Sequence, residues 1–241
     1  MTVELDPPRP GADGNPRERK ARLVREKAKA EGNGLDAASG AQRPKFPLIP
    51  FNKITFATTE EWLVKKLLPR KGVGAFYGAS GSAKTFILVD LGLHVSLGWP
   101  WAGRRVTQAP VVYIAAEGAD GLKKRIIGWK KGRDGLPVDV PFFLIEVAPN
   151  LGAGEGDLKD LITCIESAGV RPGLIGIDTV SQSIGTGDEN GAGMVQFAAN
   201  ATALANHFDC LVAPVHHVGL GDDKRLRGHT SFIGALDASV L

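Results

Sequence analysis

The chain has 241 residues, of which 43% are hydrophobic, and its 29 basic side chains exceed the 26 acidic ones by three. A chain of this length can bury a full core, and its near balance of charge is by itself no argument for binding to nucleic acid, which must rest on local clusters. It has no apolar run near the roughly 18 to 20 residues of a membrane helix and no signal peptide, which predicts a cytoplasmic protein.

Residues 1–45 differ in composition from the rest of the chain. They mix proline, glycine and charges of both signs with few large apolar residues, so burial cannot offset the entropy lost on ordering. We therefore predict a disordered, charged tail over 1–45, followed by one folded domain over 46–241. Within the tail, the run PRERKARLVREKAKAE is compatible with a charged helix formed on a partner.

From Phe51 onward, short apolar runs alternate with helical patterns. Strands are predicted at 73–77, 111–116, 142–146, 174–178 and 210–216, and helices at 84–97, 120–131, 157–168 and 192–207. This alternation is typical of an α/β fold with a mainly parallel sheet and helices on both faces. Pro214 lacks a backbone donor and favours an edge position for the last of these strands. The closing residues GALDASVL look like the start of a further strand.

The two cysteines, Cys164 and Cys210, stand in apolar segments. Neither belongs to a CxxC or Cys/His pattern of the kind that binds zinc. We therefore expect buried free thiols, as in proteins of a reducing compartment.

A glycine-rich loop joins the first predicted strand to the first predicted helix. Residues 78–85 read GASGSAKT and fit the phosphate-binding template G-x-x-x-x-G-K-[ST], except that Ala83 replaces the second glycine. We expect Ala83 to lie where the backbone already turns helical, so that its methyl group is tolerated. Backbone N–H groups and the positive end of the helix would surround phosphate oxygens, with Lys84 on the β- and γ-phosphates and the Thr85 hydroxyl on Mg²⁺. The sequence thus predicts ATP and Mg²⁺ bound by Gly78, Ala79, Ser80, Gly81, Ser82, Ala83, Lys84, Thr85 and Phe86.

Two carboxylates follow later strands. Asp178 ends the run LIGID, as expected of an aspartate that orders Mg²⁺ through water, although an aspartate at a strand end can also cap a helix. Glu117 follows VVYIAA, at the edge where ligands bind in open α/β sheets, and is the predicted catalytic base that orients the attacking water. A glutamate of an ordinary surface turn is the alternative for Glu117.

Four stretches carry a resemblance to a known family: YGASGSAKT, GRRVTQAPVVYIAAEGADGLKKRIIGW, LIGIDTVSQSIGTGDEN and VAPVHHVGLGDDKRLRGHTSF. Their order and spacing resemble those of RecA-fold ATPases of the RepA type, the plasmid and phage replicative helicases, over about residues 47–240. The resemblance implies a RecA-like P-loop NTPase core that contains Lys84 and Thr85 in the P-loop. It further implies that Glu117 is the catalytic glutamate and Asp178 the Walker B aspartate.

In that family the subunits form a ring, usually a hexamer, that encircles single-stranded DNA. The resemblance therefore implies a homo-oligomer with single-stranded DNA as a partner, a primase or other replication proteins as further partners, and no membrane. It also implies that the chain lacks the last strands of this fold.

The resemblance assigns His216 and His217 to the sensor that ends the fifth strand. Neighbouring residues on a strand point to opposite faces, so only one of the two can face a γ-phosphate, and the sequence does not decide which. Histidines that merely finish the strand are the alternative.

Loops after the Walker B and sensor strands hold single-stranded DNA in such motors. Only the second loop is basic, through Lys224, Arg225 and Arg227, whereas Asp188 and Glu189 make the first one acidic. Contacts from the basic cluster to the DNA backbone would be independent of sequence. Arg227 is alternatively an arginine finger that acts on a neighbouring subunit's nucleotide.

A second basic stretch, GLKKRIIGWKKGR, has the pattern of a helix with a solvated face. Taken together, the motifs favour an ATP-hydrolysing motor that couples hydrolysis to translocation on single-stranded DNA. The alternative is an ATP-switched DNA-binding or recombination module with slow hydrolysis. A P-loop kinase of small molecules is a third reading, for which the sequence offers no evident lid or acceptor pocket.

Overall fold

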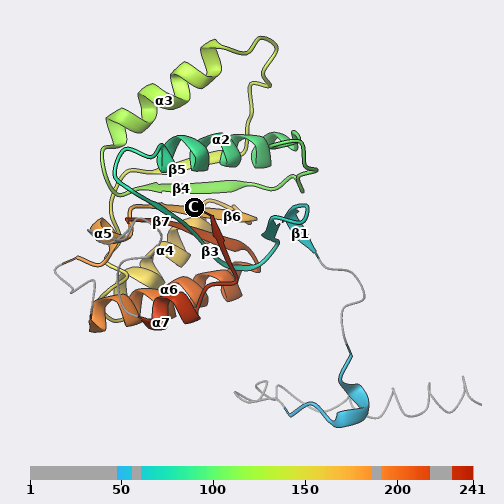
Figure 1. Ribbon diagram of the computed structural model, residues 1–241, viewed down its shortest axis with the longest axis vertical. Helices are drawn as coiled ribbons and strands as arrows, with labels where there is room; N and C mark the ends of the chain where they lie inside the picture. The colour runs from blue at the N-terminus through green and yellow to red at the C-terminus, as the bar shows by residue number, and fades with distance from the viewer. Residues whose placement is uncertain (1–47, 56–60, 186–190, 218–229, 241) are drawn as a thin grey trace, which may run out of the picture. The chain divides into compact units, whose positions relative to one another are not determined.

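The computed structural model describes residues 48–55, 61–185, 191–217 and 230–240 (Figure 1). Contacts divide the chain into two units, Met1–Phe56 and Ala57–Leu241. The described part of the first unit holds a single 3-10 turn, η1, at Phe51–Lys53. The predicted tail over 1–45 lies outside the described residues.

The second unit is built on a six-stranded sheet in the order β5-β4-β6-β7-β3-β8, in which all neighbouring strands run parallel. Its strands are β3 (Gly72–Gly78), β4 (Val111–Ala115), β5 (Phe142–Ile145), β6 (Leu174–Asp178), β7 (Leu211–His217) and β8 (Ala238–Val240). The predicted parallel α/β sheet is therefore confirmed. The strand foreseen in the closing residues forms as β8, which pairs with β3.

Helices cover both faces of this sheet (Figure 1). One face carries α2 (Lys84–Leu97) and α3 (Ala119–Lys131), and the other carries α4 (Gly156–Ser167), α5 (Val180–Ser183), α6 (Ala192–Phe208) and α7 (Thr230–Gly234). Alternate residues of each strand enter two separate cores: Val112 and Ile114 pack toward α4 and α6, whereas Val111 and Tyr113 pack toward α2. Within the described residues, no helix has the length and apolar character needed to cross a membrane.

A small antiparallel hairpin precedes the main sheet and is absent from the predicted elements. Its strands are β1 (Trp62–Val64) and β2 (Leu68–Pro69). Leu63, Val64 and Leu68 are buried in the same core as the apolar side of α2. Strands of three and two residues are too short to produce a periodic sequence signal, which explains the omission.

The edge position predicted for β7 is wrong, because β7 lies between β6 and β3 in the interior of the sheet. Pro214 pairs with Ile177 of β6. On the β3 side the register passes from Val73↔Val212 to Phe76↔Val215, so the ladder is interrupted at the proline. The missing N–H therefore coincides with a local gap in one ladder, which an interior strand can accommodate.

Only one of the two cysteines has the buried environment predicted for both. Cys210, next to the start of β7, is buried as expected, and burial raises the pKa of its thiol to about 12. Cys164 is exposed on α4, so the expectation of a buried thiol is wrong there. The reason is the helical period, which turns Cys164 outward while Leu161 and Ile165 on either side of it face the core.

Candidate nucleotide site

The loop between β3 and α2 surrounds a small space at the start of the helix. Gly78 and Gly81 have φ angles of 154° and 80°, which L-residues with side chains rarely adopt. A Cβ atom on Gly78 would approach Ser82 Oγ to 2.9 Å, so the close turn requires a glycine there. The loop thus brings backbone N–H groups and the N-terminus of α2 together, the arrangement that binds phosphate.

Lys84, the first residue of α2, closes this loop from within. Its Nζ donates hydrogen bonds to the carbonyl oxygens of Gly78 and Ala79 at 2.9 and 2.7 Å, and to Ser82 Oγ at 3.4 Å. The side chain is only 8% exposed. Burial lowers the pKa of Lys84, and the charge of Asp178 partly opposes this shift.

Ala83 does not have the helical backbone expected from the sequence. It precedes α2 with φ 64° and ψ 18°, in the left-handed region. That conformation costs an L-residue about 1–2 kcal/mol relative to the right-handed one, and a glycine would adopt it without this cost. The alanine therefore occupies the place of the motif's second glycine with the backbone of that glycine.

Asp178 ends β6 and is 4% exposed. The hydroxyl of Tyr113, on the neighbouring strand β4, donates a hydrogen bond of 2.8 Å to its Oδ2. Burial, together with the negative charge of Asp178, raises the pKa of Tyr113 well above its usual value, so the phenol keeps its proton and remains a donor. Tyr113 was not predicted as a site residue, because a tyrosine within a strand has the pattern of an ordinary core residue.

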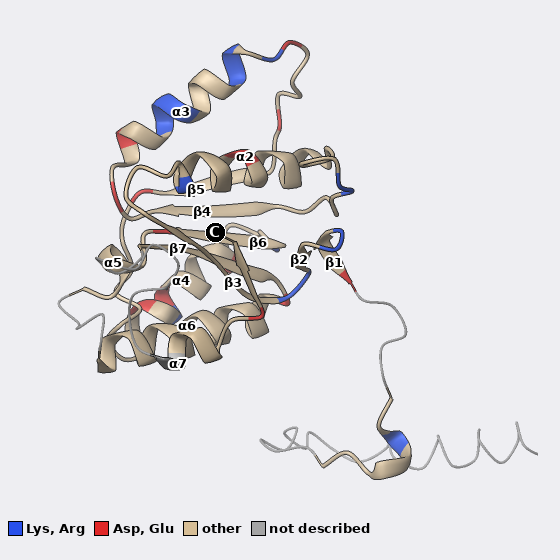
Figure 2. Cartoon of the chain, viewed as in Figure 1, with Lys and Arg blue, Asp and Glu red and all other residues tan. Residues whose placement is uncertain are grey.

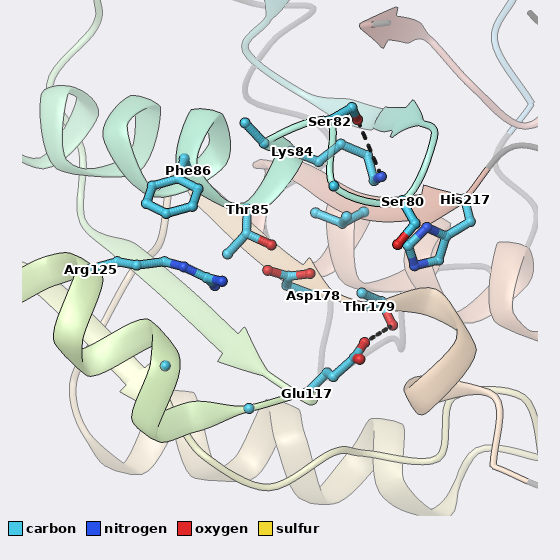
Figure 3. A pocket seen from close by; sticks show the side chains of 15 residues that line it. Ser80, Ser82, Lys84, Thr85, Phe86, Glu117, Arg125, Asp178, Thr179 and His217 are labelled. Carbon is cyan, nitrogen blue, oxygen red and sulfur yellow. Dashed lines mark hydrogen bonds between the residues drawn. The ribbon is translucent and has the colours of Figure 1, made fainter. Parts of the chain in front are cut away.

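Glu117 follows β4 by two residues and is exposed to the same space. Its backbone N–H donates to the carbonyl oxygen of Asp178 at 3.1 Å. Its Oε2 accepts a hydrogen bond of 3.4 Å from the hydroxyl of Thr179, as Figure 3 shows. These two hydrogen bonds thus connect the ends of β4 and β6 beside the carboxylates of Glu117 and Asp178.

The two histidines separate as strand geometry requires. His217 lines the same pocket as Lys84, whereas His216 is 0% exposed and points to the opposite face of β7. There the His216 ring packs edge-to-face against Phe232 of α7, with ring centroids 5.9 Å apart. The structure therefore leaves His217 as the one that can meet a bound phosphate.

Lys84, Glu117, Asp178 and His217 line one cavity of about 470 Å³, within the usual range for small-molecule sites. Its lining residues are Ser80, Gly81, Ser82, Ala83, Lys84, Thr85, Phe86, Glu117, Gly118, Gly121, Arg125, Asp178, Thr179, Val215 and His217. Of the predicted site residues, Gly78 and Ala79 line instead a smaller neighbouring cavity of about 280 Å³, which Ser82 and Lys84 also line. Lys224, Arg225 and Arg227, and the acidic Asp188 and Glu189, lie outside the described residues.

Arg125 is a charged lining residue that was not predicted from the sequence. It belongs to α3, along which basic side chains gather (Figure 2), and its Cζ lies 4.7 Å from the centre of the Phe86 ring. The solvated face predicted for this helix comprises Lys123, Lys124, Lys130 and Lys131, of which the last three are exposed, and it does not include Arg125. Helical period alone does not distinguish Arg125 from the lysines beside it.

The residues present fit Mg²⁺ held together with a triphosphate. No group of three or more metal-binding side chains occurs in the described ranges, so a resident protein-only metal centre finds no support there. Mg²⁺ needs fewer protein ligands, because it keeps waters and shares phosphate oxygens. The Thr85 hydroxyl and the Asp178 carboxylate face the same cavity and provide the oxygen ligands that it prefers (Figure 3).

A parallel sheet, a glycine-rich loop that leads into Lys84 at the start of α2 and an aspartate at the end of β6 define a P-loop nucleoside triphosphatase with a RecA-like fold. The chain matches a family model described as an AAA domain, AAA_25, over residues 41–223. It belongs to this family of P-loop ATPases, which is found in replicative helicases. A comparison with curated proteins finds no match.

Proposed function

We propose that the protein is an ATP-hydrolysing motor that couples hydrolysis to translocation along single-stranded DNA, as ring-shaped replicative helicases do. The observation that carries the proposal is the convergence of Lys84, Glu117 and Asp178 on one cavity. Membership of a family that occurs in replicative helicases favours the motor over other uses of this cavity.

Binding would use the loop that Lys84 now holds closed. Its ammonium group already bonds three oxygen acceptors, so phosphate oxygens could replace some of them with little rearrangement. Thr85 and Asp178 would hold Mg²⁺, which supplies positive charge against the phosphate oxygens when bound. Tyr113 fixes the Asp178 carboxylate by its hydrogen bond, so that the second oxygen remains directed into the cavity.

Hydrolysis would use Glu117 to orient a water molecule and accept its proton as the oxygen attacks the γ-phosphorus. The bond from that phosphorus to the β–γ bridging oxygen breaks, which leaves ADP and inorganic phosphate. The Thr179 hydroxyl restrains Glu117, and His217 can donate a hydrogen bond to the γ-phosphate. Loss of that phosphate would then remove this hydrogen bond from His217, the last residue of β7.

The DNA-binding part of the proposal rests on the basic cluster of Lys224, Arg225 and Arg227, and on assembly into a ring. The DNA-binding role of this cluster and the ring both come from the family resemblance. Sequence-independent contacts from this cluster would weaken steeply with added salt.

The deciding experiment measures ATP hydrolysis by the full chain with and without single-stranded DNA, together with its native mass with and without ATP. We expect DNA to stimulate hydrolysis and ATP to favour a ring. Glu117→Gln should retain ATP binding but lose hydrolysis by about 100-fold or more, whereas Lys84→Ala should lose binding. Glu146→Gln, which alters an exposed glutamate paired with Lys123, is the matched control.

A strand-displacement assay separates the two DNA-linked readings. Unwinding that requires ATP supports the motor. ATP-dependent DNA binding without unwinding would instead favour a switched binding module and contradict the proposal.

A further inference from the structure

Two tight turns at the end of the sheet remote from the nucleotide cavity carry a group of basic side chains. The first turn joins β1 to β2 and contains Lys65 and Lys66. The second follows α2 and ends at Arg104, with Arg105 next to it. All four residues are exposed, and we call them the turn cluster. Figure 2 shows basic residues beside β1 and β2 and in the chain that follows α2.

Backbone hydrogen bonds hold the two turns side by side. Val64 forms an antiparallel bridge with Val106, and the N–H of Lys65 donates to the carbonyl oxygen of Arg105 at 2.9 Å. Arg104 Nη1 donates to the carbonyl oxygen of Lys65 at 3.3 Å. The register that sets Val64 opposite Val106 also sets Lys65 opposite Arg105, so that two like charges stand on directly opposed positions.

This arrangement of charge opposes folding. Like charges directly opposite each other on antiparallel strands lower stability. In the part of the chain that the structure describes, no ion pair involves the turn cluster, whereas the carboxylates of Glu61 and Asp209 pair with Arg70 and Lys71 after β2. Lys66 also has a left-handed backbone, with φ 59°, which a glycine adopts at lower cost. A local cost without a compensating contact inside the fold is typical of a functional surface.

The turn cluster is firmly held and lies far from the nucleotide cavity. The backbones of Trp101 and Arg104 exchange hydrogen bonds of 3.0 and 2.8 Å, and Trp101 Nε1 donates to Asp90 of α2 at 2.9 Å. β3 leads from this end of the sheet to the phosphate loop over seven residues, which is about 20 Å. Neither of the two cavities described above includes a residue of the turn cluster.

We propose that the turn cluster is a contact surface for the sugar–phosphate backbone of nucleic acid, separate from the basic cluster of Lys224, Arg225 and Arg227. Four cations on two exposed turns suit an extended row of phosphates, whereas a single small anion would need donors that converge in a pocket. Arginine binds two phosphate oxygens at once, and lysine adds positive charge. Since the surface is remote from the nucleotide cavity, binding needs no ATP, and the inference does not depend on the proposed function.

The test measures the affinity of the full chain for labelled single-stranded and duplex DNA of equal length, without nucleotide, at several salt concentrations. Lys65→Gln/Arg105→Gln should weaken binding about fivefold or more. It should also reduce the slope of log Kd against log salt concentration by about two, one for each lost phosphate contact. The control is Lys124→Gln/Lys131→Gln, which removes the same charge from exposed positions of α3 and should change the affinity less than twofold.

Lys65→Glu separates binding from folding. It sets a carboxylate opposite Arg105, so Tm should rise by about 1–2 °C. DNA binding should nevertheless weaken at least as much as in the double variant, which a purely structural role of Lys65 would not produce. A lower Tm would contradict the repulsion on which the inference rests.

Unchanged DNA affinity of both turn-cluster variants, or equal weakening by the control, would overturn the inference. Tighter binding of polyglutamate than of DNA at the same salt concentration, lost in Lys65→Gln/Arg105→Gln, would assign the surface to an acidic protein and would also overturn it. ATP hydrolysis without DNA should be the same in the double variant and the wild type. Absence of ATP hydrolysis in the wild-type chain would overturn the proposed function and leave the turn cluster unaffected.

Discussion

The hydroxyl of Tyr113 donates a 2.8 Å hydrogen bond to Oδ2 of Asp178 across two neighbouring strands, and both side chains are buried. The bond offsets part of the free-energy cost of burying the carboxylate, and it fixes the orientation of the carboxylate toward the cavity. A core tyrosine thus sets the position of the predicted Mg²⁺ ligand.

Tyr113→Phe should therefore lower stability by about 1.5–3 kcal/mol, because it leaves a buried carboxylate without this donor. It should also raise the Mg²⁺ concentration needed for half-maximal ATP hydrolysis. Urea denaturation and a Mg²⁺ titration measure the two effects. Tyr77→Phe, at a half-buried tyrosine of β3, is the control, and equal responses of the two variants would contradict the role of Tyr113.

The two adjacent histidines should respond in opposite ways to truncation. His216→Ala removes a fully buried ring that packs against Phe232, so we expect a loss of about 2 kcal/mol or more in the free energy of unfolding. His217→Ala should change stability by less than about 0.5 kcal/mol but lower the rate of ATP hydrolysis. Denaturation and turnover measured on both variants check the assignment. A slower His216→Ala enzyme of normal stability would reverse it.

Asp90 of α2 accepts hydrogen bonds from two indole groups, of which that of Trp129 belongs to α3. Its Oδ2 accepts a hydrogen bond of 2.9 Å from Trp101 Nε1, and its Oδ1 accepts one of 2.7 Å from Trp129 Nε1. Trp129 also stacks on Trp99, with centroids 6.1 Å apart. One carboxylate thus positions the helix that carries Arg125.

Asp90→Ala should cost about 2 kcal/mol, since both bonds to the charged acceptor are lost. Asp90→Asn keeps one oxygen acceptor and should lose about half as much. Urea denaturation followed by tryptophan fluorescence gives the stabilities, and a red shift of the native emission would report the freed indoles. An Asp90→Ala protein as stable as the wild type would show that α3 is held by other contacts.

The alternation of strands and helices was predictable from the sequence because each long element has its own period. The helix predicted at 84–97 coincides with α2, and the strand at 174–178 with β6. The hairpin of β1 and β2 was not predictable, since its register depends on packing against residues such as Val106. The interior position of Pro214 was not predictable either. That proline lacks an N–H donor is known from the sequence, but this does not indicate which of the two neighbouring ladders is interrupted.

The residues of the candidate site were also predictable only in part. Lys84, Glu117 and Asp178 follow strand ends, and parallel strands bring such ends to one edge, so their convergence was foreseeable. Arg125 was not, because which face of α3 meets the cavity depends on the bonds of Asp90 to Trp129. The choice between His216 and His217 required the direction of β7 relative to α7.

The buried thiol of Cys210 should make the protein less stable at alkaline pH. Burial raises its pKa from 9.0 to about 12, so between these values the unfolded state loses a proton that the folded state keeps. Stability from this group is therefore constant below pH 9 and falls as the pH rises toward 12. Between pH 8 and pH 10 the loss should be about 1.4 kcal/mol.

Urea denaturation at the two pH values measures this loss. Cys210→Ala should flatten that part of the pH dependence, whatever its effect on stability at pH 8. Cys164→Ala, at an exposed thiol, should leave the dependence unchanged. Identical pH profiles for Cys210→Ala and the wild type would show that other groups cause the alkaline loss.

The left-handed backbone of Ala83 predicts that this departure from the glycine motif lowers stability. Ala83→Gly removes a conformational cost of about 1–2 kcal/mol, and the greater freedom of glycine in the unfolded chain takes back about 0.5–1 kcal/mol. A net gain of roughly 0.5–1 kcal/mol should appear as a rise in Tm of about 2 °C.

Ala79→Gly, in the same loop but without a positive φ, should lower Tm instead. Because the N–H of residue 83 is present in both forms, the binding of tripolyphosphate should differ little between Ala83→Gly and the wild type. A Tm that falls in both glycine variants would contradict the left-handed assignment.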